Sequence, residues 1–448
     1  MFRSQNAVAV VGMLVVAGLC GRAAAKQVKL DVSLAHPTLL AGAPQTTYVK
    51  VGLIGPAVSS AGRRAPVNVA LVLDKSGSMT GTKIVQAKNA AIHALDRLNE
   101  NDIVSVIVYD ASVQIVVPAT KLTDKAELRR AIAGIEAGGS TALFAGVSKG
   151  AAEVRKFLDR NRVNRVILLS DGRANVGPST PGMLGDLGAS LMKEGISVST
   201  LGLGLDYNED LMVELARRSD GNHMFVEAAT ALAAVFDHEF QDALSVAAQE
   251  VAITIRCAPG IRPVRLLGID GEINGREVIV RLNQLYGGQE KYALLEIEVP
   301  ESEAGQTRPI ADVEVSYANM QTKTTDQLSS GISVYFDPST RVVQDRVNVK
   351  VMAECVLQIA NERNEQAVAL RDRGQTQQAK ALLELNATYL SQNALELKSD
   401  KLQKRAMDNV EQSQGLDPEE WKRTRKISRY LQYEDARQQR ALPPSTND

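Results

Sequence analysis

The chain has little of what several protein classes depend on. Its 448 residues include three cysteines and four histidines, which excludes a disulfide scaffold and leaves little material for a histidine-rich zinc centre. The 51 basic and 52 acidic residues give a net charge of -1, whereas dedicated nucleic-acid binders carry a basic excess. With 33 glycines and 15 prolines, the chain is also neither fibrous nor of low complexity.

What remains is the composition of an ordinary globular protein. Hydrophobic residues make up 44% of the chain and charged residues 23%, so wholesale disorder is excluded. At this length we expect two or three domains, with at least one sizeable core.

The first 25 residues are typical of a secretory signal peptide. Arg3 precedes an apolar run over residues 7–19, and three alanines at residues 23–25 supply a cleavage site. The run is shorter than the ~20 residues that a membrane-spanning helix needs, and no later segment is long and apolar enough. We therefore predict an extracytoplasmic protein, secreted or periplasmic, with no transmembrane segment in the mature chain. An uncleaved leader is the alternative, and it would tether the protein to the membrane.

Removal of the leader takes Cys20 with it and leaves two cysteines, Cys257 and Cys355. An oxidising compartment allows these two residues to form a disulfide. Two separate buried thiols are the alternative, and the sequence does not decide between them.

Hydrophobic patterning divides the rest of the chain into three kinds of segment. Residues 26–65 and 247–340 alternate apolar and polar positions in short runs between Gly or Pro, as half-exposed strands do. Residues 66–246 alternate continuous apolar runs with amphipathic helical stretches, which predicts a doubly wound, mostly parallel α/β sheet of Rossmann-like form. Because two strands alone are marginally stable, we expect one β-sandwich into which this α/β domain is inserted.

The third kind of segment, residues 344–448, is predicted to be helical. Apolar residues recur every four positions from Val347 to Ile359, Gly374 interrupts the pattern, and a second stripe follows from Ala379 to Leu390. This pattern predicts a helical hairpin, similar to a single tetratricopeptide-type unit, that acts as a docking element or cap. The basic stretch WKRTRKISRY at residues 421–430 is either a solvated helix face or a contact for an anionic partner.

Oxygen-bearing side chains gather directly after the first buried strand of the α/β region. Asp74, Ser76 and Ser78 occupy alternate positions in DKSGS, so their side chains point the same way if the loop is extended. One carboxylate and two hydroxyls suit a hard divalent cation such as Mg²⁺, Ca²⁺ or Mn²⁺.

Two further residues are predicted at the same edge. Thr141 lies in AGGST between two expected helices, and Asp171 lies in LLSDG at the end of another buried strand. Open parallel sheets bind ligands at the carboxyl ends of their strands. The sequence therefore predicts one metal site that consists of Asp74, Ser76, Ser78, Thr141 and Asp171.

This set of residues, in this order and strand-and-loop context, resembles the von Willebrand factor A (VWA) domain with its metal-ion-dependent adhesion site (MIDAS). The resemblance covers roughly residues 66–246. The segment LYGGQEKYALLEIEVP at 285–300 also resembles bacterial extracytoplasmic proteins that carry one A domain inside a β-sandwich. The resemblance implies that the serines ligate the metal, that the threonine joins when the site is engaged, and that the aspartates act mostly through water.

The function that this resemblance implies is recognition, not catalysis. Few carboxylates would neutralise the cation directly, and an open coordination position would accept an Asp or Glu of a partner protein. We therefore expect a metal-dependent protein-binding (adhesion) module that is not an enzyme, that uses Mg²⁺ with Ca²⁺ or Mn²⁺ as alternatives, and that binds no nucleic acid. An accessory or assembly factor for an envelope enzyme or complex is a second reading. A metal-dependent hydrolase is a remote one, because it needs a general base beside the cation.

Several other signals carry less weight. The stretch GVSKG at 146–150 matches a hydrolase nucleophile elbow, but it falls within the helix expected over residues 143–158. His223 and His238 are interpreted as packing or surface residues. Asp110 follows another buried strand at the same sheet edge, where it is solvated or supports a metal ligand.

Overall fold

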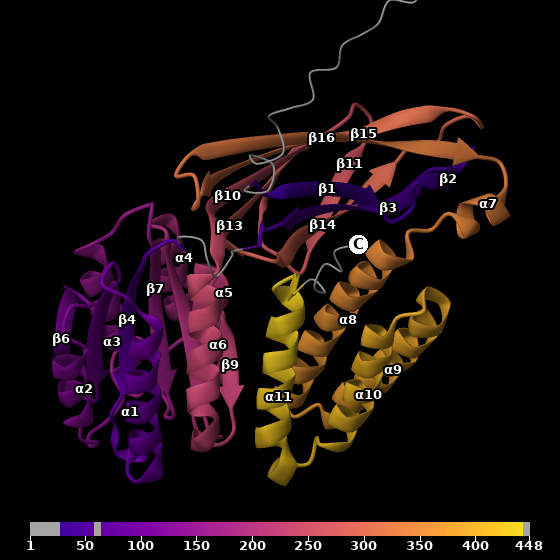
Figure 1. Ribbon diagram of the computed structural model, residues 1–448. Helices are drawn as coiled ribbons and strands as arrows, with labels where there is room; N and C mark the ends of the chain where they lie inside the picture. The colour runs from indigo at the N-terminus through magenta and orange to yellow at the C-terminus, as the bar shows by residue number, and fades with distance from the viewer. Residues whose placement is uncertain (1–26, 58–63, 442–448) are drawn as a thin grey trace, which may run out of the picture.

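The computed structural model of the protein describes residues 27–57 and 64–441. The expected signal peptide lies outside these residues. Figure 1 shows three parts: an α/β unit, a pair of antiparallel sheets, and a group of long C-terminal helices. Within the two described ranges, no helix combines the length and the apolar character that crossing a membrane requires.

The α/β unit is built on a six-stranded sheet with the order β6-β5-β4-β7-β8-β9. All neighbouring strands are parallel except β6, which runs antiparallel to β5 at one edge. The strands are β4 (Val67–Asp74), β5 (Ile103–Tyr109), β6 (Val113–Lys121), β7 (Val163–Ser170), β8 (Ile196–Leu203) and β9 (His223–Val226). The predicted mostly parallel sheet is confirmed, and β6 is an edge strand that the sequence reading did not include.

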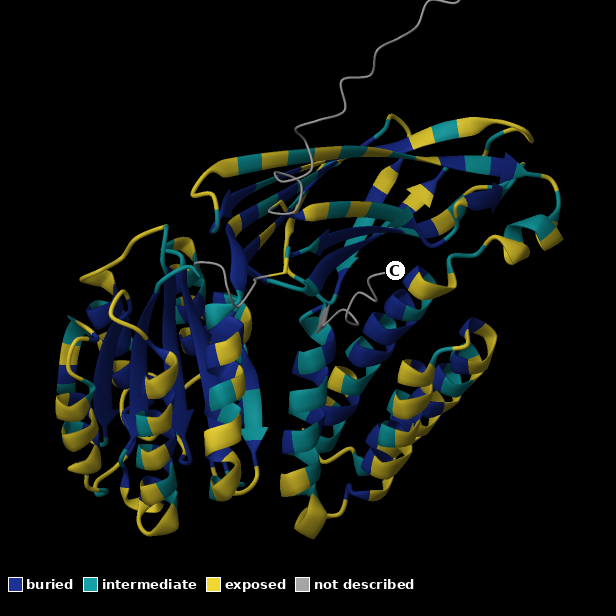
Figure 2. Ribbon diagram, viewed as in Figure 1, coloured by how far each residue is buried: buried dark blue, intermediate teal, exposed yellow. Residues whose placement is uncertain are grey.

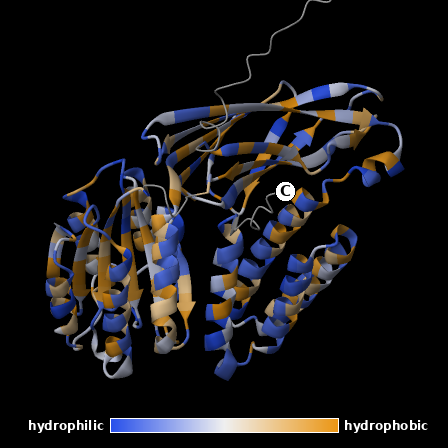
Figure 3. Ribbon diagram, viewed as in Figure 1, coloured by the Kyte–Doolittle hydropathy of each residue, from blue (hydrophilic) through white to orange (hydrophobic). Residues whose placement is uncertain are grey.

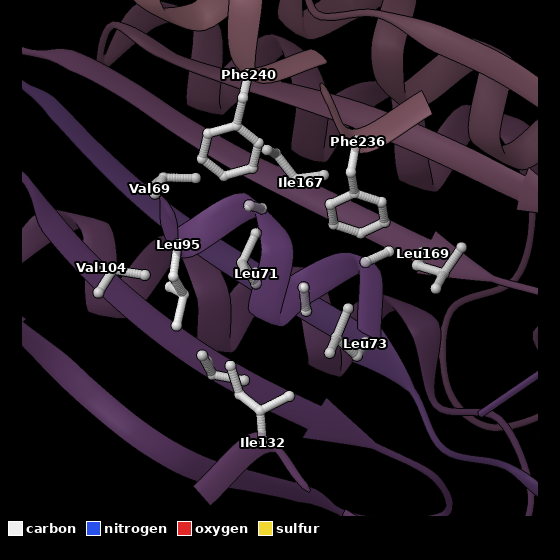
Figure 4. Packing of buried hydrophobic residues seen from close by; sticks show 14 of the residues in the cluster. Val69, Leu71, Leu73, Leu95, Val104, Ile132, Ile167, Leu169, Phe236 and Phe240 are labelled. Carbon is white, nitrogen blue, oxygen red and sulfur yellow. The ribbon is translucent and has the colours of Figure 1, made fainter. Parts of the chain in front are cut away.

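Helices cover both faces of this sheet, which is why its central strands are buried along their whole length and read as continuous apolar runs. One face carries α1 (Thr82–Ala94), α2 (Lys125–Ala133) and α6 (Leu232–Leu244). The other carries α3 (Leu143–Arg155), α4 (Pro181–Lys193) and α5 (Glu209–Ser219). Figure 4 shows the first of these cores, where Phe236 and Phe240 of α6 pack with the side chains of β4 and β7.

Two sheets, antiparallel except for the β2–β16 pair, lie together at one end of the α/β unit (Figure 1). One has the order β1-β3-β14-β11 with β17 paired to β14, and the other has the order β12-β13-β10-β15-β16-β2. The strands are β1 (Lys29–Leu34), β2 (Thr38–Leu40), β3 (Gln45–Ile54), β10 (Val246–Cys257), β11 (Arg262–Leu267), β12 (Glu272–Asn274), β13 (Glu277–Tyr286), β14 (Gln289–Val299), β15 (Thr307–Asn319), β16 (Thr325–Asp337) and β17 (Gln439–Ala441).

The strands that precede the α/β unit pair with strands that follow it. β3 is antiparallel to β14 over its whole length, from Gln45 opposite Val299 to Ile54 opposite Glu290, and β2 is parallel to β16. Both sheets contribute to a single apolar core. The insertion of the α/β unit into this pair of sheets agrees with the predicted fold class.

The C-terminal region contains more helices than the predicted hairpin. The short α7 (Thr340–Asp345) precedes α8 (Val349–Asp372) and α9 (Thr376–Leu397), which are joined at Gly374, whose φ of 79° favours glycine. Two further helices, α10 (Asp400–Gln414) and α11 (Pro418–Ala436), extend this hairpin. Figure 3 shows that hydrophilic residues predominate in α11, while α10 carries the exposed apolar side chains of Met407 and Val410.

The two cysteines of the described residues are free and buried. Cys257 belongs to the core between the antiparallel sheets, whereas Cys355 belongs to a separate cluster where α8 packs on β11 and β14. Of the two alternatives, the structure therefore shows two separate buried thiols and not a disulfide between Cys257 and Cys355. Burial raises the pKa of the Cys257 thiol to about 11, which keeps it protonated and unreactive at neutral pH.

The basic stretch of α11 contacts acidic residues of the chain's own α/β unit. Arg425 forms ion pairs with Glu209 and Asp210 at the start of α5, and Lys426 lies 2.5 Å from Glu209 Oε2. Lys422 pairs in the same way with Asp206 in the β8–α5 loop. A solvated face is therefore wrong for Arg425 and Lys426, whose side chains are largely buried against acidic residues of the same chain, whereas about half of the Lys422 side chain is exposed. The helix instead lies along α5 and the edge strand β9, where it shields the open edge of the sheet.

A buried polar junction joins the α/β unit to the antiparallel sheets. Arg165 of β7 is fully buried, pairs with Glu239 of α6 at 2.6 Å and donates to Tyr286 Oη of β13 at 2.6 Å. Nearby, Lys291 of β14 pairs with Asp220 at the end of α5 at 2.5 Å. These charges are largely removed from water, and their partners include polar groups of β13 as well as each other, so they favour one way of docking the two units.

We predict that Arg165→Met destabilises the protein by about 3–5 kcal/mol, because it leaves the Glu239 carboxylate buried without its cation. The double variant Arg165→Met/Glu239→Gln is expected to recover part of that loss. The midpoint of urea-induced unfolding measures both effects. The control is Arg97→Ala, which removes an exposed ion pair to Asp237, a residue of the same helix as Glu239. This variant is expected to leave the midpoint almost unchanged. Equal midpoints for Arg165→Met and the control would contradict the role of the junction.

A buried histidine lies beneath α11. His223 Nδ1 is 2.9 Å from Thr200 Oγ1, and the ring makes an edge contact with Tyr433 of α11 at 5.7 Å between centroids. Its Nε2 has no hydrogen-bond partner among the described residues. Burial lowers the pKa of His223 to about 3, and the opposing charges of Glu209 and Lys426 act on it less strongly.

We predict that His223 makes the protein less stable as pH falls from about 6.5 towards 3. In this window the unfolded chain takes up a proton on the imidazole, whereas the folded chain keeps it neutral. This single group contributes up to about 1.4 kcal/mol per pH unit. Unfolding midpoints of wild type and His223→Gln at several pH values test this. The variant is expected to show a flatter dependence, and parallel pH profiles would rule the assignment out.

Candidate metal site at the carboxyl edge of the α/β sheet

The carboxyl ends of the parallel strands lie at the end of the α/β unit that faces away from the antiparallel sheets (Figure 1). There the buried strands give way to partly exposed loops (Figure 2). β4 and β7 are neighbours in register, with Leu73 opposite Leu169, so the loops that follow them start side by side. Asp74 ends β4, and Asp171 directly follows β7.

Hydrogen bonds join the first two loops. The hydroxyls of Ser76 and Ser78 are 3.1 Å apart, and Ser78 Oγ donates to Asp171 Oδ1 at 2.6 Å. The carboxylate of Asp171 is completely buried. The serine pair and this aspartate, predicted from separate motifs, are therefore in direct contact.

The buried carboxylate of Asp74 accepts hydrogen bonds from the loop after β4 and from the end of β7. Its Oδ1 accepts the backbone N–H of Ser76 at 2.8 Å, and its Oδ2 accepts the hydroxyl of Ser170 at 2.7 Å. Burial raises the pKa of Asp74, and the charge of Asp171 adds to this, while the hydrogen bonds from Ser76 and Ser170 act in the opposite direction. A positive ion beside this carboxylate would relieve the cost of burying its charge.

Thr141 joins the same cluster. A Cβ atom built on Gly172 would lie 3.2 Å from Thr141 Oγ1, 3.3 Å from Ser78 Oγ and 3.8 Å from Ser76 Oγ. Three hydroxyls from two loops therefore surround one point, which only glycine at position 172 leaves free. The structure thus brings together all five residues that the sequence singled out.

The donor set fits a hard divalent cation. It offers hydroxyl and carboxylate oxygens and no sulfur or imidazole, as Mg²⁺ prefers. Within residues 27–57 and 64–441, no group of three or more His, Cys, Asp or Glu residues is arranged to hold a metal ion. A site that is rich in hydroxyls and has two carboxylates falls outside that description, so this result does not conflict with the cluster around Gly172.

Two lysines border the site. Lys75 pairs with Asp110, and Lys83 of α1 lies 2.5 Å from Asp171 Oδ2. Burial raises the pKa of the Asp110 carboxyl, but hydrogen bonds from Lys75 and Ser112 together outweigh this effect and lower it. Sequence reasoning singled out neither Lys83 nor Ser170. A serine that ends an otherwise apolar buried strand is a signal for Ser170, whereas a lysine on an amphipathic helix gives none.

The remaining motifs have structural explanations. GVSKG lies inside α3, where a Cβ on Gly146 would be 2.8 Å from the Tyr109 ring and a Cβ on Gly150 would be 2.5 Å from Val72 Cγ2. These glycines let the helix approach the sheet closely, so the helix prediction is confirmed against the nucleophile elbow. The histidines contact residues outside this cluster: His93 and His238 lie near Asp237 and Asp242 of α6, and His223 is buried beneath α11.

Comparison with known proteins agrees with the fold. Residues 68–238 match the model of the von Willebrand factor type A domain. A solved structure described as von Willebrand factor type A from Catenulispora acidiphila superposes with a TM-score of 0.67 and 16% identity, over 84% of this chain and 89% of that one. The α/β unit of this protein is a von Willebrand factor type A domain.

Two sequence relatives show how far the similarity extends. An uncharacterized protein of Synechocystis, sll0103, is 28% identical over 350 residues, which cover 76% of this chain and 82% of that protein. Human inter-alpha-trypsin inhibitor heavy chain H3 is 30% identical over 165 residues, which cover 35% of this chain and 18% of the human protein. The chain therefore spans most of the cyanobacterial relative but less than a fifth of the human one.

Proposed function

We propose that this protein is a metal-dependent protein-binding module that acts outside the cytoplasm. VWA domains typically mediate interactions between proteins, and the cluster around Gly172 is what carries the metal-dependent part of the proposal. In this cluster, the hydroxyls of Ser76, Ser78 and Thr141 would hold the cation. The carboxylates of Asp74 and Asp171 would balance its charge.

The bound cation would supply a coordination position for a carboxylate of a partner protein. The site's own residues place two negative charges next to the ion, and the charge of Asp171 is already shared with Lys83. A divalent ion held this way stays under-neutralised and therefore attracts an Asp or Glu from outside. The chain would bind this group without reacting with it, since no histidine among the described residues is shown in contact with the cluster to act as a general base.

The location and the domain organisation are part of the same proposal. The leader-like residues 1–25 support export, followed by a sandwich formed from residues 26–65 and 247–340, the A domain at 66–246 and the helical region at 344–448. The metal edge faces away from the sandwich, so a partner can approach it without contacting the antiparallel sheets (Figure 1).

We predict that the double variant Ser76→Ala/Ser78→Ala lowers the affinity for Mg²⁺ or Mn²⁺ by on the order of tenfold or more, because it removes two metal ligands. Isothermal titration calorimetry with Mn²⁺ measures this. Ser112→Ala is the matched control, because it removes a hydroxyl from the same edge of the sheet that donates to Asp110 and not to the five site residues. Capture of an envelope partner is expected to be lost with chelator and in the double variant, and kept in the control. Equal Mn²⁺ affinities in all three proteins would refute the proposed site.

A second prediction concerns the metal-binding cradle, by which we mean the point next to Gly172 that the hydroxyls of Ser76, Ser78 and Thr141 surround. In Gly172→Ala the new methyl group would occupy the point that the three hydroxyls surround, so we expect weakened Mn²⁺ binding with nearly unchanged thermal stability. Gly182→Ala in α4 is the control, because a Cβ at that position meets no atom within 4 Å. A Gly172→Ala protein that binds Mn²⁺ like the control would show that the metal does not lie at this point.

A further inference from the structure

Lys83 is the basic residue in closest contact with the candidate metal site. It is the second residue of α1, and its ammonium lies 2.5 Å from Asp171 Oδ2, while Asp171 Oδ1 accepts the hydroxyl of Ser78. Both oxygens of this buried carboxylate therefore have partners, one of which is a full positive charge. About a third of the Lys83 side chain is exposed, which leaves it room to move away.

Lys83 lies between two loops. On one side it contacts Asp171 after β7, and on the other side its Nζ would lie 3.9 Å from a Cβ atom at Gly204, where β8 ends. Asp206 in that second loop is paired with Lys422 of α11 at 2.5 Å. The ammonium therefore lies at the rim of the cradle, next to the place where the C-terminal helix is attached.

The charges of the site show what this lysine does to a bound cation. Asp74 and Asp171 carry two negative charges, which a divalent ion alone would neutralise. Lys83 adds one positive charge, so the site with its metal carries a net charge of +1. A cation must compete with the ammonium for Asp171, and the excess charge is removed when one carboxylate from outside joins the metal.

We propose that Lys83 couples metal binding to ligand binding: it keeps the affinity for the free cation low and makes the site hold the cation tightly only together with an anionic ligand. This inference rests on the proposed metal site and adds its regulation. Because coupling is reciprocal, the ligand strengthens metal binding by the same factor by which the metal strengthens ligand binding.

The test is the affinity for Mn²⁺, measured by electron paramagnetic resonance in chloride buffer and again with excess acetate as the carboxylate probe. In wild type, acetate is expected to tighten Mn²⁺ binding severalfold. Lys83→Gln is expected to bind Mn²⁺ on the order of tenfold more tightly in chloride, and to gain little from acetate. Lys83→Arg keeps the charge and is expected to behave like wild type.

Lys88→Gln is the matched control, because it removes a positive charge from the same helix, and the Lys88 ammonium donates to the backbone carbonyls of Ala133 and Ile135, away from the site. Thermal unfolding checks that each variant is folded. If wild type binds Mn²⁺ and Lys83→Gln binds it equally or more weakly, the coupling is wrong and the metal site stands. If no variant and no wild-type sample binds Mn²⁺, both proposals fall.

Discussion

The pairing of β4 with β7 is the constraint on which the candidate site depends. The two strands are buried on both faces and parallel in register, so they end at the same level of the sheet. Asp74 and Asp171 are placed by these ends, and the hydrogen bond from Ser78 to Asp171 joins the loops across them. The polar side chains at this edge cost free energy to bury, and only a well-packed sheet beneath them can hold them in place.

The remainder of the molecule contacts the A domain on two sides, and at its carboxyl edge α11 contacts the β8–α5 loop through the Lys422–Asp206 pair. The hydrogen bonds from buried Arg165 to Gln284 and Tyr286 of β13 join the domain to the antiparallel sheets at one end, and the ion pairs of α11 hold its side along α5 and β9. Both contacts involve charges that are largely removed from water, so they favour one docking geometry over others. These contacts favour one position of the A domain, in which the carboxyl ends of its strands face away from the antiparallel sheets (Figure 1).

The sequence was most informative where one physical signal dominated. Continuous apolar runs marked the buried parallel strands, and the spacing of Asp74, Ser76 and Ser78 at a strand end marked a site that the structure brings together with Thr141 and Asp171. The edge strand β6 was not predicted, because its half-exposed residues lack the continuous apolar pattern of the central strands.

Contacts between distant charges were beyond the reach of pattern analysis. The basic residues of α11 have the same spacing as a solvated helix face, and their acidic partners in the α/β unit, such as Glu227 and Glu209, lie more than 190 residues away in the chain. Lys83 shows the same limit on a smaller scale, because nothing in its local sequence indicates that it contacts Asp171. Whether a charged side chain is solvated or paired is decided by tertiary packing, which sequence periodicity does not encode.

The central claim is that one cation binds among the hydroxyls of two neighbouring loops. Anomalous diffraction from crystals grown with Mn²⁺ tests it most directly. The account predicts a single strong peak within coordination distance of the hydroxyls of Ser76, Ser78 and Thr141. A peak at another place on the molecule, with none in this cradle, would contradict it.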